Sequence, residues 1–194
     1  FLDTINGATP LHAACAGANI TVVSLLLEAG CDIDALRRDA YTPLHIACIR
    51  GDVEIVKLLL AHHADPSLPT KFGTTALHEA VYACQIEIVK LLLSSSSNGD
   101  KPLLKAIDRD GETPLHRACN ARKAAISMMQ LLLDNGADVN AADSGDGTPL
   151  HIAACSHNMD EAADRCNLLL NHGANIAAQN LHGWTPLHLA RDLG

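Results

Sequence analysis

A tetrapeptide of the form Thr-Pro-Leu-His returns along this chain, and it constrains the fold more than any other feature. Subtracting successive histidine numbers gives steps of 33, 33, 38, 35 and 37 residues. Such a period indicates stacked structural units that bury their apolar faces against their neighbours. The six Thr and His pairs are Thr9 and His12, Thr42 and His45, Thr75 and His78, Thr113 and His116, Thr148 and His151, and Thr185 and His188.

The tetrapeptide has the chemistry of a helix start. A threonine hydroxyl can cap a helix by accepting a hydrogen bond from a free amide of the first turn. Proline suits the next position, where no amide donor is needed, and leucine then begins an apolar face. Ala76 replaces proline in the third copy. We expect this change to weaken the helix start only slightly, because alanine is a strong helix former.

The six copies resemble the ankyrin repeat, and the resemblance covers nearly the whole chain. It implies an all-α ankyrin-repeat solenoid of helix-turn-helix units with projecting β-turn fingers, in which each motif histidine ties its turn to the neighbouring one. We expect a single domain over 1–194, with repeats at about 2–35, 36–68, 69–108, 109–141, 142–178 and an incomplete 179–194. Neither end has the polar capping repeat that solenoids need, so we interpret the sequence as a piece of a longer polypeptide.

Irregular spacing locates the departures from the repeat. A stop glycine ends the second helix in several repeats, but His63 stands at that position in repeat two, where we expect mild strain. Two and four extra residues lie between the helices of repeats four and five. Five more fall within 94–107 and predict a long, flexible third finger. Met128, Met129 and Cys166 align with apolar second-helix positions, so we expect them in the core.

Composition and charge narrow the class of partner. The chain is 48% hydrophobic but only 3% aromatic, so small aliphatic side chains must form the core. A formal net charge of -8 argues against a nucleic-acid partner. No apolar run of about 18 residues predicts membrane insertion, and no secretory signal leads the chain.

Cysteine usage points to a reducing compartment, the cytoplasm or the nucleus. The chain has seven cysteines without the spacing of a disulfide framework. Cys15, Cys48 and Cys119 each follow a motif histidine by three residues. Equivalent sites in stacked repeats lie about 10 Å apart, whereas a disulfide needs Cα atoms within ~7 Å. We therefore expect free thiols.

Catalysis, a metal and a cofactor are not expected. Six of the eleven histidines belong to the tetrapeptide. The chain has no phosphate loop or nucleophile elbow. Asn140 resembles the asparagine that ankyrin-directed hydroxylases modify, and the serine run 94–97 is either a phosphorylation site or a solvated loop. Four residues of the types that bind zinc lie close together in the sequence, but their spacing matches no known zinc site: Cys155, His157, Cys166 and His172.

A contact surface can be predicted from the resemblance, which places contacts four, three and one residues before the motif threonine and four and five after the histidine. Aromatic side chains at such positions are candidate binding anchors: Tyr41, Phe72, Tyr82 and Trp184. For Tyr41 and Trp184 the alternative is packing between neighbouring fingers. The position four before threonine holds a cation in three consecutive repeats: Arg38, Lys71 and Arg109.

The cation row has two interpretations. It could steer an acidic, extended partner, or it could be a solvated mixed-charge face in which Asp39 and Asp110 neutralise their neighbours. Arg50 and Asn120 add polar groups on the helix side, and we expect the principal surface on repeats two to four.

The sequence therefore predicts a non-catalytic protein–protein interaction module, acting as a scaffold, an adaptor or an inhibitory domain. Its partner is expected to be a protein, either an extended peptide or a folded domain. Two alternatives stay open: the targeting region of a larger enzyme, such as a ubiquitin ligase or a secreted effector, and the cytoplasmic domain of a channel or cytoskeletal linker. The fold alone does not choose among these, because one fold supports many partners.

Overall fold

The computed structural model describes residues 7–95, 101–121, 125–155 and 159–192. Within these ranges the chain forms helices joined by turns and loops, with no strand. Its contacts divide it into two compact units, Phe1–Leu103 and Leu104–Gly194. The expectation of one continuous domain with the six stated repeat boundaries stays a prediction.

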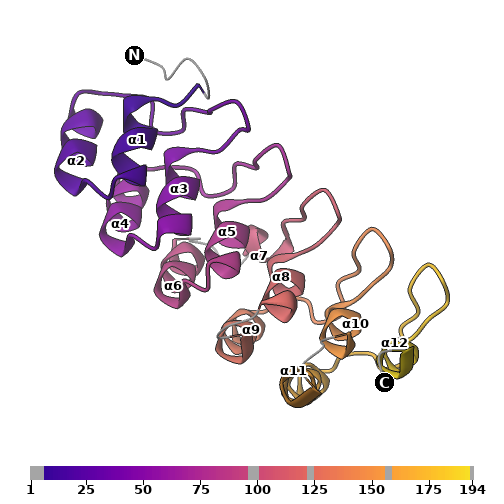
Figure 1. Cartoon of the computed structure of the whole chain (residues 1–194). Coiled ribbons are helices and arrows are strands. Elements are labelled where there is room, and N and C mark those ends of the chain that lie inside the picture. The colour runs from indigo at the N-terminus through magenta and orange to yellow at the C-terminus, as the bar shows by residue number, and fades with distance from the viewer. Residues whose placement is uncertain (1–6, 96–100, 122–124, 156–158, 193–194) are drawn as a thin grey trace. The chain divides into compact units, whose positions relative to one another are not determined.

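In the first unit, helices come in pairs that stack in register (Figure 1). Helix α1 packs on α2, α3 on α4, and α5 on α6. Neighbouring pairs then meet through α1, α3 and α5 on one side and through α2, α4 and α6 on the other. The bounds are α1 (Pro10–Ala16), α2 (Ile20–Glu28), α3 (Pro43–Arg50), α4 (Val53–Ala61), α5 (Ala76–Tyr82) and α6 (Ile86–Ser94).

The second unit repeats this plan. Helix α8 packs on α9 and α10 on α11, while α10 also contacts both α8 and α12. A loop leads into each of α8, α10 and α12 and projects to the same side (Figure 1). The bounds are α8 (Pro114–Asn120), α9 (Ala125–Asp134), α10 (Pro149–Ala154), α11 (Met159–Asn171) and α12 (Pro186–Asp192). The all-α architecture of paired helices expected from the sequence is confirmed in both units.

The leucine of the tetrapeptide is buried beneath the first helix in five of the six copies, whereas Leu187 of the last copy is 68% exposed. Its exposed fraction lies between 0% and 4% at five positions, namely Leu11, Leu44, Leu77, Leu115 and Leu150. Met128 and Met129 are both 0% exposed, as expected from their alignment with apolar positions. Burying a side chain of this size contributes about 1.5–3 kcal/mol. Leucine and methionine side chains thus form the core, because the chain has few aromatic side chains.

Five of the motif threonines begin their helices in a capping box with the motif histidine. The threonine amide donates to histidine Nδ1, for example over 3.2 Å between Thr42 N and His45 Nδ1. Nδ1 must therefore be unprotonated, and Nε2 carries the ring proton. Nε2 in turn donates to the carbonyl just before the next motif threonine. These bonds measure 2.9 Å for His12 to Tyr41, 3.3 Å for His45 to Thr74, 3.2 Å for His116 to Gly147 and 3.0 Å for His151 to Trp184.

The fingers are joined to one another by backbone hydrogen bonds. In each described pair, the residue four before the motif threonine donates its amide to a carbonyl of the preceding finger. The distance is 2.9 Å for Lys71 to Asp39, Ser144 to Asp110 and Leu181 to Gly145. Within a unit, each finger therefore fixes the position of the next, and the surface that the fingers present is ordered before any partner binds.

The structure differs from the sequence-based prediction in the third finger and at Cys166. The third finger was predicted to be a long, flexible loop, but within it Pro102–Lys105 forms the one-turn helix α7. Leu103 and Leu104 in this turn are 2% and 4% exposed, so their burial favours the helix and the prediction is wrong there. Residues 96–100, including part of the serine run, lie outside the described residues. Cys166 was expected in the core but is only half-buried, because Arg165 is the buried side chain at that point of α11.

The strain expected at His63 is present. His63 has φ = 68°, in the left-handed region, and ends α4 where Gly30, Gly136 and Gly173 end their helices. A non-glycine residue in this conformation costs roughly 1–2 kcal/mol, because Cβ approaches the following carbonyl.

Candidate functional site

Three of the four predicted aromatic anchors have exposed side chains. Tyr82 is 70% exposed and Phe72 is 52% exposed, although both belong to well-packed repeats. Trp184 is 43% exposed, and its carbonyl accepts the hydrogen bond from His151. Phe72 and Tyr82 are thus presented on an ordered scaffold, one in the finger before α5 and one at its end.

Tyr41 instead packs between neighbouring repeats. Its hydroxyl donates to Glu79 Oε1 over 3.2 Å, and its ring meets the His45 ring edge-on at 5.5 Å between centroids. The Arg37 guanidinium lies 4.7 Å from the ring centroid. Burial, followed by the Glu79 carboxylate, raises the pKa of Tyr41 to about 12. These contacts favour the packing alternative over a role as a free anchor.

The expected cation row divides between the two units. Arg38 and Lys71 are exposed on successive fingers of the first unit, and Arg109 is exposed in the second. The carboxylate thought to neutralise Arg38 is held elsewhere, because Asp39 accepts two hydrogen bonds from Arg37, at 2.7 and 2.9 Å. Burial alone would raise the pKa of Asp39, but these bonds lower it below its ordinary value. Asp39 is thus engaged mainly by Arg37, and both interpretations of the cation row stay predictions.

One exposed apolar residue of the first unit was not identified from the sequence. Ile49 is 40% exposed in the last turn of α3, next to the exposed Arg50. It stands four residues after its motif histidine, as Tyr82 does, and α3 packs on α5. Position within the repeat was the signal that could have identified it. Together, five exposed residues of the first unit make up what we name the aromatic surface: Ile49, Arg50, Lys71, Phe72 and Tyr82.

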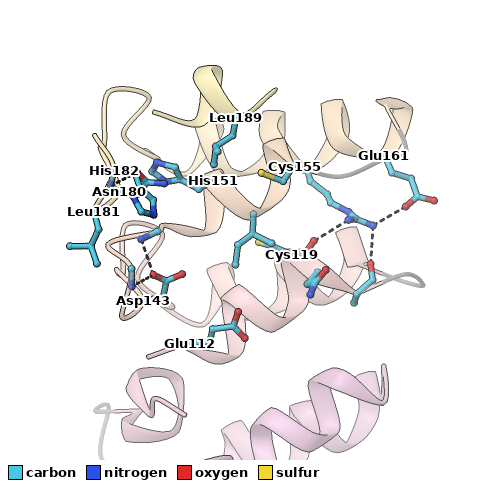
Figure 2. A pocket seen from close by; sticks show the side chains of 16 residues that line it. Glu112, Cys119, Asp143, His151, Cys155, Glu161, Asn180, Leu181, His182 and Leu189 are labelled. Carbon is cyan, nitrogen blue, oxygen red and sulfur yellow. Dashed lines mark hydrogen bonds and ion pairs between the residues drawn. The ribbon is translucent and has the colours of Figure 1, made fainter. Parts of the chain in front are cut away.

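The second unit contains a groove of about 850 Å³ between its fingers and its helices (Figure 2). Of the predicted contact residues, Asn120 lines it. The finger side is formed by Glu112, Asp143, Gly145, Gly147, Asn180, Leu181 and His182. The helix side is formed by Cys119, Asn120, Ala121, His151, Ile152, Cys155, Glu161, Arg165 and Leu189.

Carboxylate and amide side chains shape the finger wall of the groove. Asp143 Oδ1 accepts hydrogen bonds from the amides of Gly145 and Gly147 at 2.7 and 2.8 Å. Asn180 Oδ1 makes the same pair of bonds one repeat later, to His182 and Trp184, both at 3.0 Å. Asparagine and aspartate are therefore interchangeable for the geometry of this turn, and only their charge differs.

A buried arginine supports the helix wall. Arg165 is 5% exposed and occupies the position that Met128 and Ile55 hold in earlier repeats. It donates to the carbonyls of Cys119 and Ala121, at 3.0 and 2.8 Å, and to Glu161 at 2.8 Å. Its Nε is buried without a hydrogen-bond partner. Its charge thus meets the carbonyl end of α8, where cations are favourable. An arginine aligned with apolar residues was the overlooked signal.

The cysteines and Asn140 are the remaining candidates for reaction or modification. All seven cysteines are free thiols. Burial raises the pKa of Cys15 to about 12, and it raises the pKa values of Cys48 and Cys119 as well. These thiols are poor nucleophiles, because the thiolate is the reactive form. Asn140 uses its amide to donate to Gly173 O and its oxygen to accept from Asn175 N, at 3.1 and 2.8 Å.

The described residues contain neither a metal-binding cluster nor a helix that could span a membrane. No group of three or more His, Cys, Asp or Glu side chains among them could hold a metal ion. His157, one of the four zinc-type residues, lies outside the described residues. No described helix has the length and apolar character to cross a membrane.

Comparison with known families covers the whole sequence. The family described as "Ankyrin repeats (3 copies)" matches residues 1–70, 63–143 and 121–194. The chain belongs to the ankyrin-repeat family. Ankyrin repeats are generally protein-interaction modules, and this coarse role applies to the chain.

Segments of this chain are also similar to parts of several known proteins. "NAD-dependent deacetylase sir2B" of Dictyostelium discoideum is 36% identical over 75 residues, which are 31% of this chain and 10% of that protein. "Protein fem-1 homolog A" of Danio rerio is 43% identical over 58 residues, or 30% of this chain and 9% of that protein. "I-Kappa-B like protein F1" of Microplitis demolitor bracovirus is 39% identical over 62 residues, or 31% of this chain and 38% of that protein. The chain thus matches only a minor part of each relative.

Proposed function

We propose that this chain is a non-catalytic recognition module that binds a protein through the aromatic surface of its first unit. The observation that carries the proposal is the exposure of Phe72 and Tyr82, 52% and 70%, in a chain with very few aromatics. Exposed aromatic side chains on an ordered surface are frequent binding hot spots. The capping boxes and finger-to-finger bonds order this surface in advance, which lowers the entropy cost of binding.

Charge around the aromatic surface favours an acidic partner segment. Lys71 and Arg50 belong to the surface and are exposed, and Arg38 is exposed on the preceding finger. Cations arranged in this way steer an acidic chain toward the surface and raise the association rate. An extended peptide or a folded domain with an acidic edge would both satisfy this chemistry. We place the module in a reducing compartment, the cytoplasm or nucleus, which the seven free thiols support.

The alternative of a targeting region within a larger enzyme keeps the same binding role. It is favoured by the relative named as a deacetylase, of which the matched segment is 10%. In that case the catalytic activity belongs to another part of the longer chain, and the aromatic surface selects the protein that is acted on.

A comparative capture experiment tests the proposal. The full chain and its Phe72→Ala/Tyr82→Ala variant are immobilised and exposed to the same lysate, after circular dichroism has shown equal helicity. Leu170→Ala is the matched control, because Leu170 is 41% exposed on α11 in the other unit. We expect at least one protein that binds the wild type and the control but not the double variant. Identical protein lists from all three chains contradict the proposal.

A further inference from the structure

We propose that Asp34 makes the junction between the loops after α2 and α4 sensitive to pH, because only its protonated carboxyl can bridge the two loops with two hydrogen bonds. The equivalent junction in the second unit is bridged by Asn140, whose amide provides a donor and an acceptor at any pH. Three observations support the proposal: the shared geometry of the two junctions, the chemical difference between the two side chains, and the charges around Asp34.

The loops that carry the two side chains have the same local geometry. Asp34 and Asn140 each lie four residues after the glycine that ends the second helix. The amide of Asp34 donates to Asp32 Oδ1 over 3.1 Å, and the amide of Asn140 donates to Asp138 Oδ1 over 2.9 Å. The two side chains therefore start from the same kind of turn.

The acceptor half of the bridge is common to both junctions. Asn140 Oδ1 accepts a hydrogen bond from the Asn175 amide over 2.8 Å. Asp34 Oδ1 accepts one from the Asp65 amide over 3.1 Å. Asn175 and Asp65 each lie two residues after the left-handed residue that ends the preceding helix. Each side chain thus joins its own loop to the loop of the next helix pair.

The donor half of the bridge differs. Asn140 Nδ2 donates to the Gly173 carbonyl over 3.1 Å. The equivalent carbonyl is that of His63, whose φ of 68° is left-handed like the 88° of Gly173, and within the described ranges no donor reaches it. A carboxylate only accepts hydrogen bonds, whereas a protonated carboxyl carries one O–H donor. Asp34 can therefore complete the bridge to His63 only when it is protonated.

The groups around Asp34 favour the protonated form. Burial raises the pKa of Asp34, and the carboxylates of Asp65 and Asp32 raise it further, against the hydrogen bond from the Asp65 amide. The imidazoles of His62 and His63, on the neighbouring loop, are exposed. Because the pKa is raised on folding, protonation of Asp34 stabilises the junction, and this contribution is lost as pH rises through the raised pKa.

The junction controls how firmly the first helix pair is held. In a solenoid each helix pair is held chiefly by its neighbours. The pair α1 and α2 packs on α3 and α4. With Asp34 ionised, this contact has half of the bridge that Asn140 supplies in the second unit. Acidification should therefore reduce the opening of α1 and α2 away from α3 and α4 relative to a chain without the titrating group.

Reciprocal substitutions exchange the two side chains. Asp34→Asn supplies the missing donor to the first unit, and Asn140→Asp removes it from the second. Protection of the Asp65 and Asn175 amides against hydrogen exchange is measured by NMR in the full chain, and the Asp34 carboxyl carbon signal reports its protonation. Asp164→Asn is the control, because it makes the same replacement at an exposed aspartate of α11.

The expected changes are local and opposite in sign. At pH 7.5 Asp34→Asn should raise the protection of the Asp65 amide by about two- to fivefold over wild type, and Asn140→Asp should lower that of the Asn175 amide by a similar factor. The ratio of Asp34→Asn to wild type at Asp65 should approach one as Asp34 becomes protonated, while circular dichroism shows native helicity. Taking this ratio cancels the titration of the histidines, which is common to both chains.

Each result decides for or against the proposal. Higher protection in Asp34→Asn and lower protection in Asn140→Asp at neutral pH, with a ratio that falls toward one in acid, supports it. Unchanged protection in both variants at neutral pH overturns it. A ratio that stays constant while the Asp34 carboxyl titrates, or the same trend in Asp164→Asn, also overturns it. None of these variants alters Phe72 or Tyr82, so the proposed function stays separately testable.

Discussion

Acid should destabilise this fold through its motif histidines, and His45 offers the clearest test. His45 is 1% exposed, and burial is the main reason that its pKa is lowered from 6.5 to about 4. Its Nδ1 must stay unprotonated to accept the Thr42 amide, while Nε2–H donates to the Thr74 carbonyl. Protonation at Nδ1 would therefore abolish the acceptor of the capping box.

The sign and size of the effect follow from the two pKa values. Above pH 6.5 His45 is neutral in both the folded and the unfolded chain, so it adds no pH dependence. Between pH 6.5 and pH 4 the unfolded chain binds a proton that the folded chain does not, and stability falls as pH falls. From a folded pKa of about 4 and an unfolded value near 6.5, the free energy of unfolding should decrease by about 2 kcal/mol between pH 7.5 and pH 5.

The assay compares His45→Gln with the wild type by urea unfolding at several pH values, followed by circular dichroism. The variant loses hydrogen bonds at every pH, but glutamine does not titrate. The stability gap between the two chains should therefore shrink by about 2 kcal/mol from pH 7.5 to pH 5. His62→Gln is the control, because it makes the same replacement at an exposed histidine. A gap for His45→Gln that stays constant across this range would refute the reasoning.

Three further predictions concern strain, the buried arginine and charge. His63→Gly should raise the free energy of unfolding by about 1 kcal/mol, because φ at that position is left-handed. Gly136→Ala should lower the free energy of unfolding by a similar amount, since Gly136 also has a left-handed φ. Thermal or urea unfolding measures both, and an unchanged stability in either variant would contradict the strain argument. Arg165→Ala should cost about 3 kcal/mol, because it removes the buried side-chain volume together with the donor to Glu161 and to two helix-end carbonyls. Arg165→Met, the side chain found at the equivalent position of repeat four, removes the same donor but keeps most of the volume and should cost less; equal losses in urea unfolding would show that the hydrogen bonds and not the packed volume determine the cost. Once a partner has been captured, Arg38→Glu/Lys71→Glu should slow its association and reverse the salt dependence in surface plasmon resonance, while an unchanged rate would show that these cations play no part in binding.

Local chemistry explains why much of the fold could be predicted from the sequence. A threonine, the residue after it and a histidine three positions on lie within one helical turn, so their hydrogen bonds depend on few distant residues. The same holds for the left-handed stop at His63, since the spacing to the motif histidine locates it. The burial of Met128 and Met129 followed from alignment with other repeats.

The failures involve contacts between residues distant in sequence. Arg165 is buried only because the end of α8 supplies carbonyls, and no local pattern reveals that partnership. The burial of Leu103 and Leu104, which turns part of the third finger into a helix, likewise follows from packing rather than from the loop's own composition.

Some residues that line the groove could be placed there from the sequence, and others could not. Glu112 and Asn120 occupy repeat positions that the resemblance marks as contact sites, and so could be placed on this surface from the sequence. Asp143 and Glu161 lie at other positions. Asp143 lies in a finger turn, and Glu161 lies in α11, which is longer than the second helices α2, α4 and α6. Repeat alignment alone could therefore not place these two carboxylates on the groove.

The central claim, that the exposed aromatics of the first unit contact a protein, is tested most directly by photocrosslinking in cells. A photoreactive phenylalanine analogue replaces Tyr82 in one chain and Leu170 in a matched control, both of them large exposed side chains. The account predicts a covalent adduct with a specific protein from position 82 and none of that protein from position 170. Adducts that are absent at position 82, or the same at both positions, would contradict it.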